Sequence, residues 1–306
     1  MKFQREPVRR LPDGVIAKVY PFHFCTKGEK IIFRTEEDFR IAFNNIPINA
    51  LRSNVIPIMP CVLSSHVHCC LLARSYEEAC TFALNYKKTT SMFLSHKYGI
   101  GKGSFREDDA KVLFLEDDRY VRNTICYIAG NAMDMGSRID TYIWSGYRAL
   151  FCDGKMPSGL RKVSEMSRRT VRKVFRSEIL LKGVEWMIGD TGILEPASFC
   201  DWRYAESAFY GDVNFFTKVI GSVDREQMDQ KLIYDPSRRK SVEELLRDIE
   251  GRSQRRYNLP FSSLNPAQKI PILKAINYST DISVKLLARL FEMTEEKVSI
   301  ILKRAK

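Results

Sequence analysis

The order of hydrophobic patterns in the first 133 residues constrains the fold of this chain more than any other feature. Short apolar runs predict strands at residues 14–26, 55–63, 67–73 and 110–115. Longer segments with helical spacing of apolar residues predict helices at residues 36–53, 76–98 and 117–133. The order strand, helix, strand, strand, helix, strand is that of the split βαβ, or ferredoxin-like, unit. We therefore expect an α+β domain over residues 1–150.

The remainder of the chain predicts an all-helical C-terminal region. Helical patterns cover residues 171–183, 199–207, 266–277, 283–291 and 294–306. The last of these segments have the apolar spacing of a helix-turn-helix, although Glu292 stands where that motif prefers glycine. We expect a basic helical extension over residues 151–260 and a helix-turn-helix-like region over residues 261–306. A small packing or dimerisation bundle is the alternative for the tail.

The charge balance indicates a polyanionic partner. The 306 residues include 49 Lys plus Arg against 37 Asp plus Glu, a net charge of +12. The candidates are nucleic acid and an acidic membrane surface, and we expect nucleic acid. No apolar run approaches the roughly 20 residues that cross a bilayer. A hydrophobic content of 44% excludes disorder of the whole chain. The charged beginning of the chain differs from an apolar signal peptide, so we expect a cytoplasmic protein without a membrane partner.

The basic excess is concentrated in two stretches. Residues 155–176 hold eight basic residues and one acid, and residues 238–256 hold seven basic residues and four acids. Such runs are usually solvated surface, but beside a nucleic-acid enzyme core they favour contact with phosphates. The side chains that we expect to contact nucleic acid are Lys27, Arg168, Arg169, Arg172 and Lys173.

Two of the chain's four histidines form the sequence His66-Val67-His68 at the start of a predicted strand. Side chains two residues apart leave the same face of a strand, so both imidazoles can reach one metal ion. A core or surface pair is the alternative. Cys70 lies on the same face and could complete a structural zinc site with Cys61, although a buried thiol is the simpler reading. The eight cysteines show no disulfide framework, and we expect reduced thiols.

A second cluster of polar residues lies on the predicted helix 117–133. Tyr127 and Asn131 are four residues apart and therefore share a helical face. Tyr120 lies seven residues earlier on nearly the same face, so spacing alone does not choose between the two phenols. If this helix covers the strand of His66 and His68, a phenol and an amide oxygen approach the metal position.

These segments resemble a known family. In order along the chain they are VYPFHFCTKG, RTEEDFRIAF, IPIMPCVLSSHVHCCLL, RYVRNTICYIAGN and WSGY. Together they resemble the HUH-type single-tyrosine transposases, in particular the REP-associated tyrosine transposases related to insertion-sequence TnpA proteins. The resemblance extends over about 135 residues, and it implies a ferredoxin-like catalytic domain.

The resemblance also implies a set of roles and a reaction. His66 and His68 would be the metal-binding pair, Asn131 the third ligand and Tyr127 the nucleophile. The activity implied is site-specific cleavage and joining of single-stranded or hairpin DNA through a 5′-phosphotyrosine, with Mg²⁺ or Mn²⁺ as cofactor. We expect a monomer or homodimer in the bacterial cytoplasm or nucleoid.

Departures from the family pattern define the competing hypotheses. Ser65 replaces the usual asparagine before the histidine pair, and Ala132 replaces the proline that usually follows Asn131. Together with Gly130 inside the helix, the change at Ala132 favours a domesticated, non-catalytic DNA-binding regulator on the same fold. A zinc-stabilised nucleic-acid-binding protein is a third possibility.

Overall fold

The structure is a computed structural model that describes residues 9–25 except 12, 31–99, 110–225 except 116, 178 and 180, residue 228, and 242–303 except 281 and 283. The chain divides into two compact units, Met1–Arg225 and Glu226–Lys306. The boundaries that we predicted at residues 150 and 260 fall inside these units. None of the described helices combines the length and apolar character needed to cross a bilayer.

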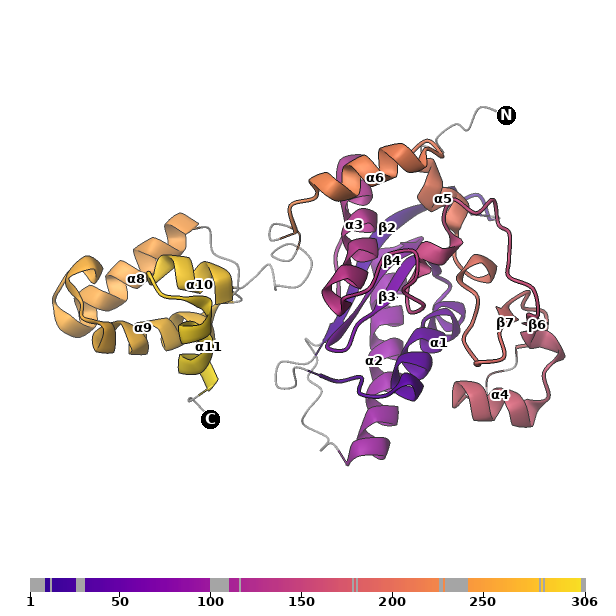
Figure 1. Cartoon of the computed structure of the whole chain (residues 1–306), viewed down its shortest axis with the longest axis horizontal. Helices are drawn as coiled ribbons and strands as arrows, with labels where there is room; N and C mark the ends of the chain where they lie inside the picture. The colour runs from indigo at the N-terminus through magenta and orange to yellow at the C-terminus, as the bar shows by residue number, and fades with distance from the viewer. Residues whose placement is uncertain are drawn as a thin grey trace. The chain divides into compact units, whose positions relative to one another are not determined.

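An antiparallel sheet forms the centre of the first unit (Figure 1). Its strands are β1 (Arg9–Arg10), β2 (Ile16–Cys25), β3 (Ile56–Val62), β4 (His66–Ala73) and β5 (Ala110–Val112). β4 lies between β2 and β3, while β1 and β5 pair with β2 on its other side. The longer part of the sheet therefore has the order β5-β2-β4-β3. The predicted strands are present, and the α+β class is confirmed.

Helices cover both faces of this sheet. α1 (Glu36–Arg52) and α2 (Tyr76–Tyr98) pack on one face, where Phe22 and Phe24 contact aromatic rings of α2. α3 (Asp118–Gly130) packs against β3 and β4. Because successive strand residues point to opposite faces, His23 between the two phenylalanines points toward the face of α3. The polar side chain of His23 therefore lies between the sheet and α3.

The segment after α3 adds a further edge to the sheet. α3 continues as a 3₁₀ helix, η2 (Asn131–Met135), and a second one, η3 (Gly146–Ala149), follows. Between them Ser145 forms a bridge with Cys61 of β3. A side chain at Gly146 would collide with the ring of Pro60, so this close approach requires glycine.

Residues 151–225 are not all-helical, which corrects our expectation for this region. Their elements are β6 (Arg161–Lys162), η4 (Val163–Glu165), α4 (Arg168–Phe175), β7 (Met187–Ile188), η5 (Pro196–Ser198), α5 (Trp202–Ser207) and α6 (Val213–Ser222). β6 and β7 pair as a small antiparallel sheet. α4 ends at Phe175, and the left-handed φ of 51° at its C-cap, Arg176, terminates the helix that we predicted to reach residue 183.

The second unit is a helical bundle. Its described residues form α8 (Val242–Tyr257), η7 (Phe261–Ser263), α9 (Pro266–Ser279), α10 (Val284–Leu290) and α11 (Glu295–Lys303). Its buried core joins Leu245 and Ile249 of α8 to Ile276, Leu287 and Val298 of the following helices. The helices predicted in the tail are present. They share their core with α8, which lies before the tail that we delimited at residue 261.

Candidate metal and tyrosine site

Three histidines from adjacent strands meet on the α3 face of the sheet. The β2–β4 pairing places His23 directly opposite His68, and His66 lies opposite Cys25. One ring nitrogen from each histidine lies within 4.8 Å of the others. The ring centroid of His68 is 4.7 Å from that of His23 and 4.8 Å from that of His66. This spacing allows the three imidazoles to hold one metal ion.

The three imidazoles are neutral near pH 7. Burial lowers the pKa of His66 to about 4. Burial also lowers the pKa values of His23 and His68 well below the usual value, and neighbouring positive charge lowers them further. Neutral imidazole is the form that binds a metal. Nδ1 of His23 is buried without a hydrogen-bond partner, which is a costly arrangement that a ligand would relieve.

Ser65 orients one of the histidine rings. Its Oγ lies 2.8 Å from Nδ1 of His66. When Nδ1 of His66 donates this hydrogen bond, Nε2 is unprotonated and available to a ligand. The hydroxyl of Ser65 is therefore compatible with a metal-binding tautomer of His66.

Tyr127 of α3 joins the histidine group. Its hydroxyl oxygen lies 3.5 Å from Nε2 of His68, and the two rings are 5.3 Å apart at an interplanar angle of 83°. The side chain is only 2% exposed. Tyr120, the alternative phenol, is 38% exposed near the start of the helix. The phenol that contacts the histidine group is therefore that of Tyr127.

Asn131 is linked to Tyr127 through Arg225. The amide oxygen of Asn131 accepts a hydrogen bond of 2.8 Å from Arg225, while its Nδ2 is buried without a partner. Arg225 also pairs with Asp134 at 2.6 Å, and its guanidinium carbon lies 5.6 Å from the centre of the Tyr127 ring. A positive group thus bridges the predicted third ligand and the predicted nucleophile.

Gly130 provides the space for this guanidinium. A Cβ atom at Gly130 would lie 2.8 Å from Nη1 of Arg225. In the sequence, Gly130 favoured a less rigid site. In the structure, it permits the close contact between α3 and Arg225.

The cysteines do not form part of the histidine group. Within the described part of the chain, neither a thiol nor a carboxylate belongs to it. Burial raises the pKa of Cys61 to about 12 and raises the pKa of Cys70 as well. Both thiols are therefore protonated, whereas the metal-binding form of cysteine is the thiolate.

Two residues at the site, His23 and Arg225, were not predicted from the sequence. His23 was one of only four histidines and lay in a predicted strand, so its residue type was a signal. The place of Arg225 at the site could not be predicted from its neighbours in sequence. It contacts Asn131, which is 94 residues earlier in the chain, through tertiary packing.

The predicted nucleic-acid contacts lie in different places. Lys27 falls outside the described residues. Arg168, Arg169, Arg172 and Lys173 are all exposed on α4. Helical spacing groups Arg168 with Arg172 and Arg169 with Lys173, so the four side chains form two pairs on α4.

Comparisons with known proteins give partial likenesses. A family model described as gluconate 2-dehydrogenase subunit 3 matches residues 199–299, which is less than half of the chain. A solved structure of a REP-associated tyrosine transposase bound to a REP hairpin is similar over 50% of this chain and 88% of its own, with 13% sequence identity and a TM-score of 0.35. No curated protein matches the chain. These likenesses do not assign the chain to a family, and the function proposed below rests on the residues of the site.

Proposed function

We propose that this protein is a metal-dependent tyrosine transesterase that cleaves and rejoins single-stranded or hairpin DNA. The observation that carries the proposal is the hydroxyl of Tyr127 beside His68 in a group of three histidines. A phenol beside a metal-binding group has the composition needed for nucleophilic attack on a phosphodiester. The net charge of +12 supports a polyanionic substrate.

The residues present fit a divalent ion. His23, His66 and His68 supply neutral nitrogen ligands, and Asn131 remains the further ligand implied by the sequence. A bound ion would stabilise the negative charge that grows on the phosphate. Imidazole ligands bind Mn²⁺ more tightly than Mg²⁺, and they also suit zinc. We therefore propose Mn²⁺ as the more tightly held of the two expected ions.

The chain's own residues carry the bond exchange. The phenolic oxygen of Tyr127 forms a bond to phosphorus while the bond from phosphorus to the 3′ oxygen breaks. The phenol loses its proton and the leaving 3′ oxygen gains one, so the reaction consumes neither water nor ATP. The guanidinium of Arg225 stabilises both a phenolate and an approaching phosphate by its charge. The reverse attack by a 3′-OH rejoins the strand.

The strand order supports the ferredoxin-like fold that we expected. Strands in the order β5-β2-β4-β3, with α1 after β2 and α2 after β4, follow the split βαβ pattern. We propose a bacterial cytoplasmic protein that acts as a monomer or homodimer, with the helical tail as a DNA or partner contact.

Substitution of the nucleophile tests the proposal. Tyr127→Phe removes one hydroxyl, so it should abolish the covalent protein–DNA adduct while DNA affinity changes less than about threefold. The assay incubates the protein with a library of single-stranded hairpins and Mn²⁺ and detects adducts on denaturing gels. Tyr120→Phe is the matched control and should retain the adduct. Loss of the adduct in the Tyr120 variant alone would contradict the assignment.

One observation favours the non-catalytic regulator as a second candidate. Tyr127 and Asn131 are 2% and 1% exposed, and Arg225 lies over the tyrosine ring. A regulator would bind DNA with unchanged affinity in the Tyr127 variant and form no adduct with any divalent ion even as the natural protein.

A further inference from the structure

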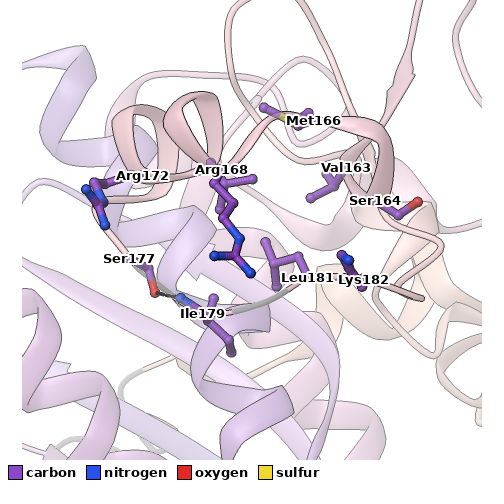
Figure 2. A pocket seen from close by; sticks show the side chains of 10 residues that line it. Val163, Ser164, Met166, Arg168, Arg172, Ser177, Ile179, Leu181 and Lys182 are labelled. Atoms are coloured by element: carbon purple, nitrogen blue, oxygen red, sulfur yellow. Dashed lines mark hydrogen bonds between the residues drawn. The ribbon is translucent and has the colours of Figure 1, made fainter.

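A basic pocket lies beside α4, in the part of the first unit that follows the expected catalytic domain. It has a volume of about 170 Å³. Its walls come from η4, from α4 and from the residues Ser177, Ile179, Leu181 and Lys182 that follow the helix (Figure 2). Such a volume accommodates several water molecules, so it exceeds the needs of a single bound ion.

The lining combines positive charge with an apolar floor. Figure 2 shows Arg168 between Arg172 at one end of the pocket and Lys182 at the other, and the apolar side chains of Ile179 and Leu181 belong to the same lining. No acidic side chain is among the described residues that line the pocket. Guanidinium groups recognise phosphate oxygens, and their planar faces and the apolar floor suit the flat face of a base.

Hydrogen bonds and an ion pair fix the walls. Oγ of Ser177 accepts hydrogen bonds from Arg52 at 3.1 Å and from the backbone N–H of Ile179 at 3.3 Å. Arg176, the C-cap of α4, pairs with Glu37 at 3.1 Å. Both contacts connect the segment beside the pocket to α1.

We propose that this pocket binds one nucleotide unit of single-stranded DNA, away from the histidine group. Arg168 holds the phosphate, Arg172 and Lys182 add positive charge at the two ends of the pocket, and the apolar side chains receive the sugar or base. The DNA identity of the strand rests on the proposed function, whereas the nucleotide chemistry rests on the pocket. A free nucleotide has the same chemistry, and the experiment separates the two sources.

Substitutions that remove the positive charges of the lining test the pocket. Fluorescence anisotropy with a labelled single-stranded dodecamer in EDTA measures binding by the full chain without cleavage. Arg168→Ala with Arg172→Ala should weaken binding about tenfold or more, and Lys182→Glu should do the same. The matched controls are Lys88→Ala with Arg203→Ala, which removes two exposed positive charges away from α4, and Lys218→Glu. Each control should cost less than about threefold.

Equal losses in the pocket and control variants would overturn the proposal. They would show that DNA is attracted by the overall positive charge and not by this pocket. Unchanged affinity in the pocket variants would overturn it as well. Competition by dTMP, with inorganic phosphate as the comparison, distinguishes the sources. A strand-bound nucleotide predicts that dTMP competes only at concentrations far above that of the dodecamer. A dTMP affinity equal to that of the dodecamer would replace the strand by a free nucleotide. Because no cleavage is measured, an inactive Tyr127 leaves these results intact.

Discussion

Arg225 brings a positive charge to the histidine group, where we propose that a metal ion binds. Burial lowers the pKa of His68, and the nearby charges of His23, His66 and Arg225 lower it further. The ion pair with Asp134 compensates part of this charge. A metal ion and Arg225 therefore repel each other, while a phenolate and Arg225 attract.

Neutralising Arg225 should separate metal binding from chemistry. Arg225→Gln removes the repulsion, so Mn²⁺ affinity should rise about three- to tenfold, as expected for roughly 1 kcal/mol of screened charge interaction. Cleavage at saturating Mn²⁺ should fall, because the charge that supports the phenolate is lost. Isothermal titration and adduct assays measure the two effects. Arg138→Gln, which breaks an exposed pair with Asp140, is the control and should change neither.

His23 should be a metal ligand equal to the predicted pair. His23→Ala removes one of three nitrogens, so Mn²⁺ affinity should fall by at least about tenfold. His96→Ala is the matched control, because His96 is the one remaining histidine and is exposed on α2. Unchanged affinity in the His23 variant would leave the ligand set at the two histidines and Asn131.

The residues of the site differ in how far sequence could predict them. His66 and His68 share a face by the period of a strand, and that is a local property. The position of His23 depends on which residue of β4 stands opposite, and register is set by pairing between distant segments. Arg225 depends on the packing of a distant segment against α3, which no local pattern records.

At the scale of elements, the start of α1 shows how a buried acid stabilises a helix. Asp38 accepts backbone hydrogen bonds from Arg34 and Thr35 and pairs with Lys97 at 2.7 Å. Tyr98 donates a further hydrogen bond to it. Burial alone raises the pKa of this carboxyl, but these hydrogen bonds lower it by more, so the net pKa lies below the ordinary 3.8.

The contribution of Asp38 should disappear in acid. A depressed folded pKa means that the stabilisation is complete above the unfolded value of 3.8 and is lost as pH falls below it. Asp38→Asn should lower stability by about 2 kcal/mol at pH 7, because a charged cap and ion pair are lost. Melting temperatures of both proteins should differ by a constant amount from pH 7 to pH 5 and converge below pH 3.8. A constant difference down to pH 3 would contradict this assignment.

Element prediction succeeded where patterns were long and failed where they were short. α2 begins after Ser75 and ends before Gly99, and both signals stand in the sequence. β6 and β7 span two residues each, which is too short for a period to appear. α4 ends early because its C-cap, Arg176, adopts a left-handed conformation, and no glycine stands at this position to signal the end of the helix.

For the whole molecule, the two units predict a separation of roles. The proposed ligands and nucleophile lie in Met1–Arg225, and the bundle has its own core. A protein ending at residue 225 should therefore cleave a short oligonucleotide at saturation. If the bundle contacts phosphates, the DNA affinity of this truncated protein and the salt dependence of that affinity should both fall. Each lost contact with a single strand should reduce the slope of log affinity against log salt by roughly 0.7. Anisotropy at several salt concentrations measures both quantities.

An unchanged affinity and salt slope, with a change in oligomeric state by light scattering, would make the bundle an assembly element. A truncation at residue 225 removes the whole bundle. A truncation at residue 262, near the predicted start of the tail, would instead expose the core residues Leu245 and Ile249 of α8.

The opposition of His23 and His68 across β2 and β4 also bears on how the protein unfolds. These strands are distant in sequence, so the chain closes a long loop when they pair. An ion held by histidines from both strands would act as a removable cross-link across that loop. At a hundredfold excess over its dissociation constant it would add about 2.7 kcal/mol to stability. Opening of the central strands, followed by hydrogen exchange of their amides, would then become slower as metal is added, so metal supply would set the lifetime of the fold as well as its chemistry.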